Sequence, residues 1–434
     1  MTRLALHPVR APRPWPLVVV LLLGAATPPT VAEDEFERPP IAYSATTPVN
    51  PVERLQEALD AGATRLGFDP DTGYLPGILA ALDVPVSSQT LVFSKTSLQQ
   101  SRIRPTNPRA IYFNDDVYVG YVRTGDVLEI SVADPVLGAV FYTLEQVAAE
   151  RPRFIRQTDD CLLCHGGSQT RGIPGHVVRS VYPDADGQPI FAAGSHRVDH
   201  TTPFEKRFGG WIVTGDHGSR HLGNAVYTRR GGPGELPTPD PLPRFAAAGY
   251  LSADSDLVAL LVLAHQTHAH NVLTKASFDV RAALHREAAL NAELGEPADH
   301  RWGSTETILD AAAAAVVDCL LFRDEAPLPT PLAGSSEYAV AFAARGPCDP
   351  LGRSLRTFDL RTRLFRHPCS FLIYSPSFDA LPEDLRQRFW SRLAAVLEAA
   401  PGNDGLDHLS ADDRATLRSI LAATKPGTPP GWSE

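Results

Sequence analysis

The spacing of apolar and polar residues predicts a strand-rich first half. Short apolar runs, some of them alternating with polar residues, are separated by the turn formers Asn, Asp, Gly and Thr, which is typical of antiparallel strands. Hairpins are predicted to turn at Asn114–Asp116 and at Thr124–Asp126, and a strand is predicted over 139–144. A further hairpin is predicted to pair residues 176–182 with 190–193 across Asp184–Gly187.

The second half changes to helical spacing. Helices are predicted over 254–290, as one long helix or two, over 305–322 and from Pro382 onwards, with a capping-box-like start for the last one at Ser410. One earlier helix is predicted within 51–68. The long helix begins with LVALLVL, which is apolar on all sides and therefore predicts burial.

A Pro/Gly-rich stretch, GGPGELPTPDPLP, marks the change from strands to helices. It divides the chain into a predicted signal peptide (1–32), an α+β region (33–230), a connector (231–249) and a mainly helical region (250–434) that is expected to pack on the first. The expected fold class is therefore α+β.

Composition narrows the class of protein. The 434 residues are 43% hydrophobic and 21% charged, as in a packed globular protein. The formal charge is −10 and no strongly basic stretch occurs, which argues against nucleic acid as a partner.

The N-terminus resembles an export signal. It has three arginines, a short apolar core at Leu17–Ala26 and the small-residue site Thr30–Ala32 before Glu33. The core is too short to span a bilayer, so the mature chain is expected to be periplasmic or secreted and to lack a membrane span. An uncleaved anchor is the alternative.

The segment DCLLCHGG contains the CxxCH pattern of covalent haem c attachment. Two thiols three residues apart can reach the two vinyl groups on one edge of a porphyrin, and the next residue can bind the iron. The sequence thus predicts one haem c, attached at Cys161 and Cys164, with His165 as the proximal ligand.

Three other interpretations of the motif stay open. A thioredoxin-like CxxC normally opens a helix, but Gly166 and Gly167 argue against a helix that continues past His165. In the second, Cys161 and Cys164 bind zinc together with two histidines. In the third, Cys161 and Cys164 form a disulfide that closes a small loop.

The second axial ligand is less constrained. The only methionine is Met1, in the predicted signal peptide, so a His/Met haem is excluded for the mature chain. A histidine ligand, a lysine ligand or an open site remain, and neutral pH favours histidine over lysine. The candidate distal residues are His217, His221, His265 and His268, with His176 and His200 as weaker candidates and Lys95, Lys206 and Lys275 as weak competitors.

Two further sets of residues have predicted roles. Arginine matches carboxylates geometrically, so Arg179, Arg197 and Arg220 are candidates to bind the haem propionates. Cys319 is predicted to be a buried thiol, and Cys348 with Cys369 is the candidate disulfide of an exported protein.

The chain resembles uncharacterised exported monohaem c-type cytochrome-like proteins. The stretches that carry the resemblance are NPRAIYFNDDVYVGYV, CLLCHGG, DHTTP, GGWIVTGDHG, RHLGN and RLFRHPCSFLIYS. The resemblance implies haem binding at Cys161, Cys164 and His165, within an enclosure larger than a small cytochrome c. Similar sequences carry Met where Leu222 stands here, so a Met ligand at that position is lost.

Two functions follow from a single haem c. One is electron transfer with an unidentified periplasmic redox partner, which is the favoured function because haem attachment alone implies only redox chemistry. The other is a peroxidase-like enzyme or small-ligand sensor with an open sixth site. A structural exported protein without a cofactor is the third class.

Overall fold

The computed structural model describes residues 34–229, 236–243, 245, 247–400 and 406–432. The predicted signal peptide lies outside the described residues, as does part of the predicted connector.

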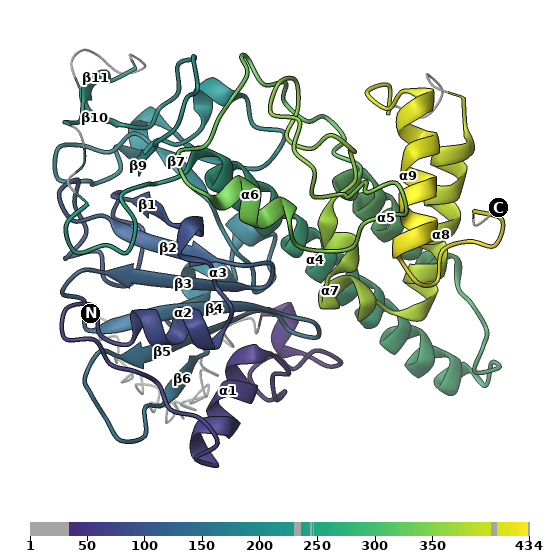
Figure 1. Ribbon diagram of the computed structural model, residues 1–434. Helices are drawn as coiled ribbons and strands as arrows, with labels where there is room; N and C mark the ends of the chain where they lie inside the picture. The colour runs from purple at the N-terminus through teal and green to yellow at the C-terminus, as the bar shows by residue number, and fades with distance from the viewer. Residues whose placement is uncertain (1–33, 230–235, 244, 246, 401–405, 433–434) are drawn as a thin grey trace, which may run out of the picture. The chain divides into compact units, whose positions relative to one another are not determined.

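A seven-stranded antiparallel sheet organises the N-terminal half (Figure 1), in the order β6-β5-β4-β3-β2-β1-β9. Both hairpins predicted at 114–116 and 124–126 are confirmed, and the strand predicted over 139–144 lies within β5. The strands are β1 (Thr90–Val92), β2 (Arg109–Phe113), β3 (Val117–Val122), β4 (Val127–Asp134), β5 (Gly138–Glu145), β6 (Phe154–Gln157) and β9 (Trp211–Ile212).

The third predicted hairpin is wrong in its pairing. β7 (Arg179–Val181) pairs with β8 (Ser195–Arg197), while residues 191–193 form a short 3-10 helix. Pro183 and Pro189 flank the turn and form only an isolated bridge. Because proline has no N–H to donate, it interrupts the ladder, and the chain pairs again only beyond it.

The C-terminal half is mainly helical, so the α+β class with a β-rich first half is confirmed. The helix predicted over 254–290 is a single helix, Leu257–Leu294, the capping box at Ser410 is present, and the early helix ends at Asp60. The helices are α1 (Pro51–Asp60), α2 (Leu75–Ala81), α3 (Leu162–His165), α4 (Leu257–Leu294), α5 (Gly303–Leu320), α6 (Tyr338–Ala343), α7 (Pro376–Asp379), α8 (Glu383–Glu398) and α9 (Ala411–Thr424).

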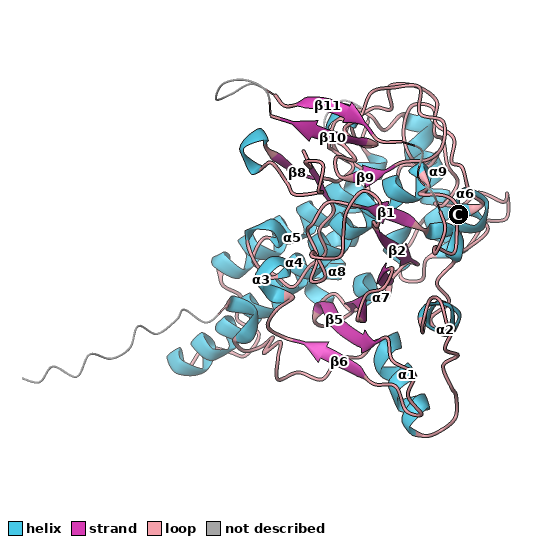
Figure 2. Ribbon diagram, turned by 90° about the vertical axis from the view of Figure 1, so that its left-hand side faces the viewer, coloured by secondary structure: helices cyan, strands magenta, loops and turns pink. Residues whose placement is uncertain are grey.

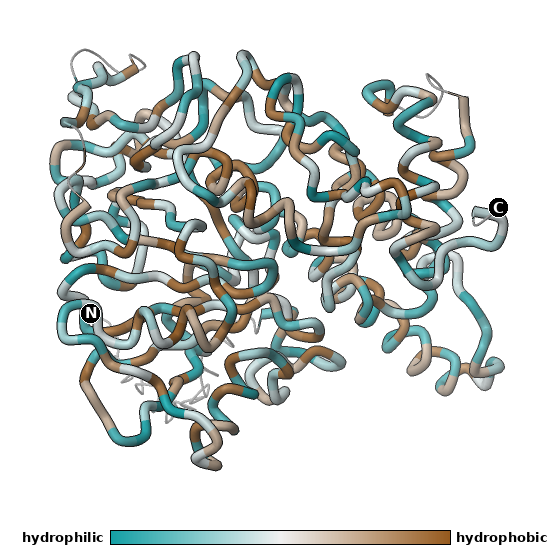
Figure 3. Tube along the Cα trace, in the orientation of Figure 1, coloured by the Kyte–Doolittle hydropathy of each residue, from teal (hydrophilic) through white to brown (hydrophobic). Residues whose placement is uncertain are grey.

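The sheet has an apolar core on each face. On one face, Tyr112, Val119 and Ile130 pack with α1 and α2. On the other, Phe113 and Tyr118 pack with α4 and the helices beyond it, and hydrophobic residues concentrate along α4 and the central strands (Figure 3). Helix α4 therefore lies between the sheet and the C-terminal helices, and its first turns are buried on all sides as predicted.

Part of the predicted connector is a strand. Thr238–Pro241 forms β11, which pairs with β10 (Ala225–Thr228) as a two-stranded ribbon separate from the main sheet (Figure 2). Among the residues that the structure describes, no helix is both long and apolar enough to cross a membrane.

Candidate functional site

The CxxCH motif forms one exposed helical turn after β6, an edge strand of the main sheet. Cys161 precedes α3, which ends at His165, and Gly166 terminates it as predicted. Leu163 is 82% exposed and Cys164 is exposed, so this turn faces solvent. Both thiols are free, on one helical turn.

The His165 imidazole is held from one side only. Its Nδ1 lies 2.9 Å from the carbonyl oxygen of Gly175, and the amide of Gly175 donates back to the His165 carbonyl at 2.9 Å. A carbonyl can only accept, so Nδ1 carries the proton and Nε2 has the free lone pair. Nε2 makes no hydrogen bond to any described residue. Burial lowers the pKa of His165, which favours the neutral imidazole that binds metals.

Helix α4 fixes the segment that holds His165. The side chain of Asn271 accepts from the His176 amide at 2.8 Å and donates to the His176 carbonyl at 2.7 Å. A Cβ on Gly175 would lie 2.5 Å from Asn271 Oδ1, so only glycine fits there. The orientation of His165 is therefore set by a helix more than 100 residues further along the chain.

Two rows of side chains on the sheet lie under the motif. In the first row, Phe141 stands opposite Ser131 on β4, and the Phe141 ring lies 4.8 Å from the His165 ring and 6.2 Å from that of His176. His176 Nε2 lies 3.2 Å from Ser131 Oγ.

The second row contains an ion pair. Glu129 on β4 stands opposite Gly120 on β3, and the guanidinium of Arg109 crosses Gly120 to reach the Glu129 carboxylate at 2.7 Å. A Cβ on Gly120 would lie 2.3 Å from Arg109 Nη2, so the missing side chain provides this path.

The ion pair and the motif interact electrostatically. Burial raises the pKa of the Cys161 thiol to about 11, Glu129 raises it further, and Arg109 lowers it. The same two residues act on the pKa of His165. A thiol with a raised pKa is a poor thiolate, which disfavours a thioredoxin-like role.

The predicted distal histidines fall into two groups. His265 and His268 share a face of α4 as expected and surround His200, with ring centroids 5.2 and 5.5 Å from that of His200. His217 and His221 face each other instead, with their Nε2 atoms 3.3 Å apart, beside Phe208.

Hydrogen bonds connect the first group to its neighbours. Ser370 Oγ lies 2.7 Å from His265 Nε2, and His265 Nδ1 lies 3.2 Å from His200 Nδ1. Both nitrogens of the fully buried His265 are therefore engaged, and the same holds for His217 and His221. Burial lowers the pKa of His200 to about 4, and a backbone hydrogen bond with Arg323 raises it.

His268 is the best prepared candidate in that group. Its Nδ1 lies 3.6 Å from an Asp199 carboxylate oxygen, and its Nε2 makes no hydrogen bond to any described residue. Burial lowers the pKa of His268 to about 4, Asp199 raises it, and Arg171 and Arg197 lower it. Arg171 belongs to the loop after the motif, so His268 lies near that loop.

The other predicted residues lie as follows. Arg179 bonds Ser195, Arg197 bonds the Gln169 carbonyl, and Arg220 is exposed. Cys319 is buried as predicted. The Cys348–Cys369 disulfide is wrong in this structure, because Cys369 is buried in the helical core whereas Cys348 is exposed, and both are free.

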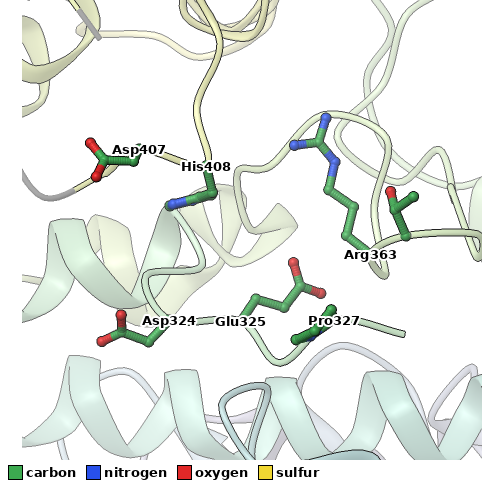
Figure 4. A pocket seen from close by; sticks show the side chains of 7 residues that line it. Asp324, Glu325, Pro327, Arg363, Asp407 and His408 are labelled. Atoms are coloured by element: carbon green, nitrogen blue, oxygen red, sulfur yellow. The ribbon is translucent and has the colours of Figure 1, made fainter. Parts of the chain in front are cut away.

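A separate cavity lies in the C-terminal half. It has a volume of about 460 Å³ and is lined by charged and polar side chains, including Glu325, Arg363 and His408 (Figure 4). None of its lining residues belongs to the motif or to the two histidine groups. In the described part of the chain, no group of three or more His, Cys, Asp or Glu side chains is arranged to hold a metal ion, so the zinc interpretation gains no support.

No sequence motif singles out Arg109, Glu129 and Asn271, which only the fold brings near the CxxCH turn. The only feature in the sequence that could have indicated the ion pair is Arg109 in an apolar strand, followed by Gly120 on the next strand. Comparison of the chain with known protein families, curated proteins and solved structures finds no match.

Proposed function

We propose that the chain binds one haem c through Cys161 and Cys164, with His165 Nε2 as an iron ligand. The carrying observation is the hydrogen bond from His165 Nδ1 to the Gly175 carbonyl. Metal-binding histidines commonly donate their other N–H to such a group, which fixes the tautomer and the ring orientation. The two free thiols on the same turn supply the covalent attachment. The resemblance of CLLCHGG and the other quoted stretches to exported monohaem proteins points the same way.

Electron transfer is the role that the exposed motif favours. A covalent haem supplies a one-electron redox centre. Leu163 and Cys164 are exposed beside it, so a redox partner would reach the attached edge without a change in the fold. The partner is a periplasmic or extracytoplasmic electron donor or acceptor, in accordance with the predicted signal peptide.

Haem retention tests the proposal. After expression with a cytochrome c maturation system, the protein should keep its haem through denaturing electrophoresis, whereas Cys161→Ala/Cys164→Ala should lose it. Cys348→Ala is the matched control, since that cysteine is also exposed and free. A wild-type protein without covalent haem, or retention in the double variant, would refute the proposal.

Export is a separate test. The mature N-terminus should lie near Glu33. Sequencing that finds Met1 on cytoplasmic protein would remove the basis for haem attachment, which takes place outside the cytoplasm.

A further inference from the structure

The cavity in the C-terminal half has walls that are bonded to one another. They come from the turn after α5, the loop 359–366 and the segment before α9 (Figure 4). The Leu364 amide donates to Glu325 Oε1 at 2.9 Å, and His408 Nε2 lies 2.7 Å from the Leu321 carbonyl oxygen. Because these hydrogen bonds join all three walls, the fold itself forms the cavity, and its volume of about 460 Å³ suits a small organic molecule.

The charges that line the cavity are not balanced. Arg363 is the only arginine or lysine among the described lining residues, and its Nη2 donates to Asp413, outside the lining, at 2.8 Å. The side chains of Asp324 and Asp407 make no hydrogen bond or ion pair with a described residue, and Glu325 uses only one of its two oxygens. The lining therefore has an excess of negative charge, which attracts a cation.

The lining also indicates the kind of cation. A carbonyl oxygen can only accept, so His408 Nε2 carries the proton and Nδ1 presents a lone pair. Together with the carboxylates, this acceptor suits a primary ammonium group, which has three N–H donors. No Phe, Tyr or Trp is among the described lining residues, so the aromatic cage typical of quaternary ammonium sites is missing there. No three described side chains are arranged to hold a metal ion.

Glu325 links such binding to proton release. Burial raises the pKa of its carboxyl group to about 7, whereas the hydrogen bond from Leu364 and the charges of Arg207 and Arg363 lower it. The charge of Asp359 raises it further. At neutral pH a fraction of the molecules therefore carries a protonated Glu325, and an ammonium group beside it would favour the carboxylate.

We propose that this cavity binds a small organic molecule with a primary ammonium group, held by Asp324, Glu325 and Asp407. The ammonium group donates to these carboxylates, and the rest of the ligand occupies the remaining volume. The ligand is a free amine or an amino acid, because both carry this group, and Arg363 would donate to the carboxylate of the second. No residue of the CxxCH turn lines the cavity, so this site is independent of haem attachment.

Isothermal titration calorimetry of the full mature chain with putrescine and with lysine, at about pH 7, tests the site. At least one of them should bind saturably, and the tighter one identifies the ligand as a free amine or an amino acid. Tetramethylammonium, which has no N–H, should bind about tenfold more weakly or less. Both amines stay protonated at this pH, so heats that depend on the buffer report proton release by the protein. Glu325→Gln should abolish that dependence.

A charge-neutralising variant tests the acceptors. Asp324→Asn/Asp407→Asn should weaken amine binding about tenfold or more, because two charged acceptors are lost. Asparagine tolerates the φ of 59° at position 324 as aspartate does, so the turn is kept. Asp71→Asn/Asp186→Asn is the matched control, since both residues are exposed and outside the lining. It removes the same net charge and should change the affinity by less than about threefold.

Three results would overturn the site. They are binding of neither amine, equal weakening by the double variant and its control, and an affinity for tetramethylammonium equal to that for the amines. Each of them leaves haem retention unchanged, so the two proposals can fail separately.

Discussion

The single side chain of Asn271 holds the loop that contains Gly175 and His176 against helix α4. Its amide satisfies both the N–H and the C=O of His176, and these backbone groups are buried. Since Gly175 precedes His176 and holds His165, the asparagine connects α4 to the CxxCH turn through one residue of backbone.

Asn271→Ala should therefore destabilise the fold. It leaves two buried backbone groups without partners, at a cost of about 2–5 kcal/mol in the free energy of unfolding. Chemical denaturation measures this change. Gln387→Ala, which removes an exposed amide that bonds only Glu383, should change stability by less than about 0.5 kcal/mol. Equal effects of the two substitutions would contradict the role given to Asn271.

The buried histidines predict how stability depends on pH. Burial, as the largest cause, lowers the pKa of His200, His268 and His270 to about 4, whereas in the unfolded chain histidine titrates near ~6.5. Below about pH 6.5 the unfolded state binds protons that the native state does not bind. The free energy of unfolding should thus be highest above about pH 6.5 and fall as the pH decreases towards about 4.

Denaturation at about pH 7.5 and about pH 5 measures the effect, on the order of 2 kcal/mol for each fully buried imidazole. His268→Gln should reduce the loss between these two values. His285→Gln should not, because His285 is exposed. If the free energy of unfolding of the wild-type protein is equal at both pH values, the native state does not keep His200, His268 and His270 neutral.

At the scale of elements, the start of α4 is tied to a distant loop. Asp256 caps the helix by accepting from the Ala259 amide at 2.9 Å, and its second oxygen accepts from the Ser335 and Ser336 amides at 2.8 and 2.9 Å. The Asp256 side chain is fully buried. Its carboxylate lies so close to Gly334 that a Cβ at that position would lie 2.6 Å from Asp256 Oδ2. One carboxylate thus positions both the helix and the loop before α6.

Asp256→Ala should cost about 2–4 kcal/mol in the free energy of unfolding, because the buried Ala259 N–H and the part-buried N–H groups of Ser335 and Ser336 lose their acceptor. Ser410→Ala removes the exposed cap of α9 and should cost only about 1 kcal/mol. Thermal and chemical unfolding of both variants compare a buried and an exposed cap in one protein. Similar losses would show that burial adds nothing to the cap.

The sequence predicts correctly those elements that depend on interactions between residues close together in the chain. The hairpin at Asn114–Asp116 forms because Asn114 Oδ1 accepts from two amides within the turn, and the helix cap at Ser410 is equally local. The strand predicted over 190–193 is wrong because Pro183 and Pro189 interrupt the ladder next to the turn. The partner of β7 therefore lies further along the chain, at Ser195–Arg197. The motif was found because its five residues are contiguous. Arg109, Glu129 and Asn271 were not, because they come from three elements that only the fold brings together.

At the scale of the whole molecule, the sheet depends on the C-terminal half. Phe113 and Tyr118 on its α4-facing side pack in the same core as Leu257–Ala264 and the later helices. A fragment ending at residue 250 would leave this face in water, and apolar burial is the main stabilising contribution to folding.

We therefore expect the 34–250 fragment to lack a cooperative unfolding transition, measured by circular dichroism during denaturant titration. The 34–434 chain should show one. A cooperative transition in the fragment would show that the strand-rich half is an independent domain.

The place of α4 in the chain also affects biosynthesis. A chain that is exported as proposed crosses the membrane from its N-terminus, so the CxxCH turn would emerge about ninety residues before the start of α4, the helix that covers the sheet and whose Asn271 binds the backbone of His176. During that interval the His165 ring lacks the support that later fixes its orientation, and the face of the sheet beneath it is open. Cofactor attachment in this interval would meet less steric resistance than in the finished protein. Once Asn271 binds the backbone of His176, the orientation of the His165 ring would be fixed.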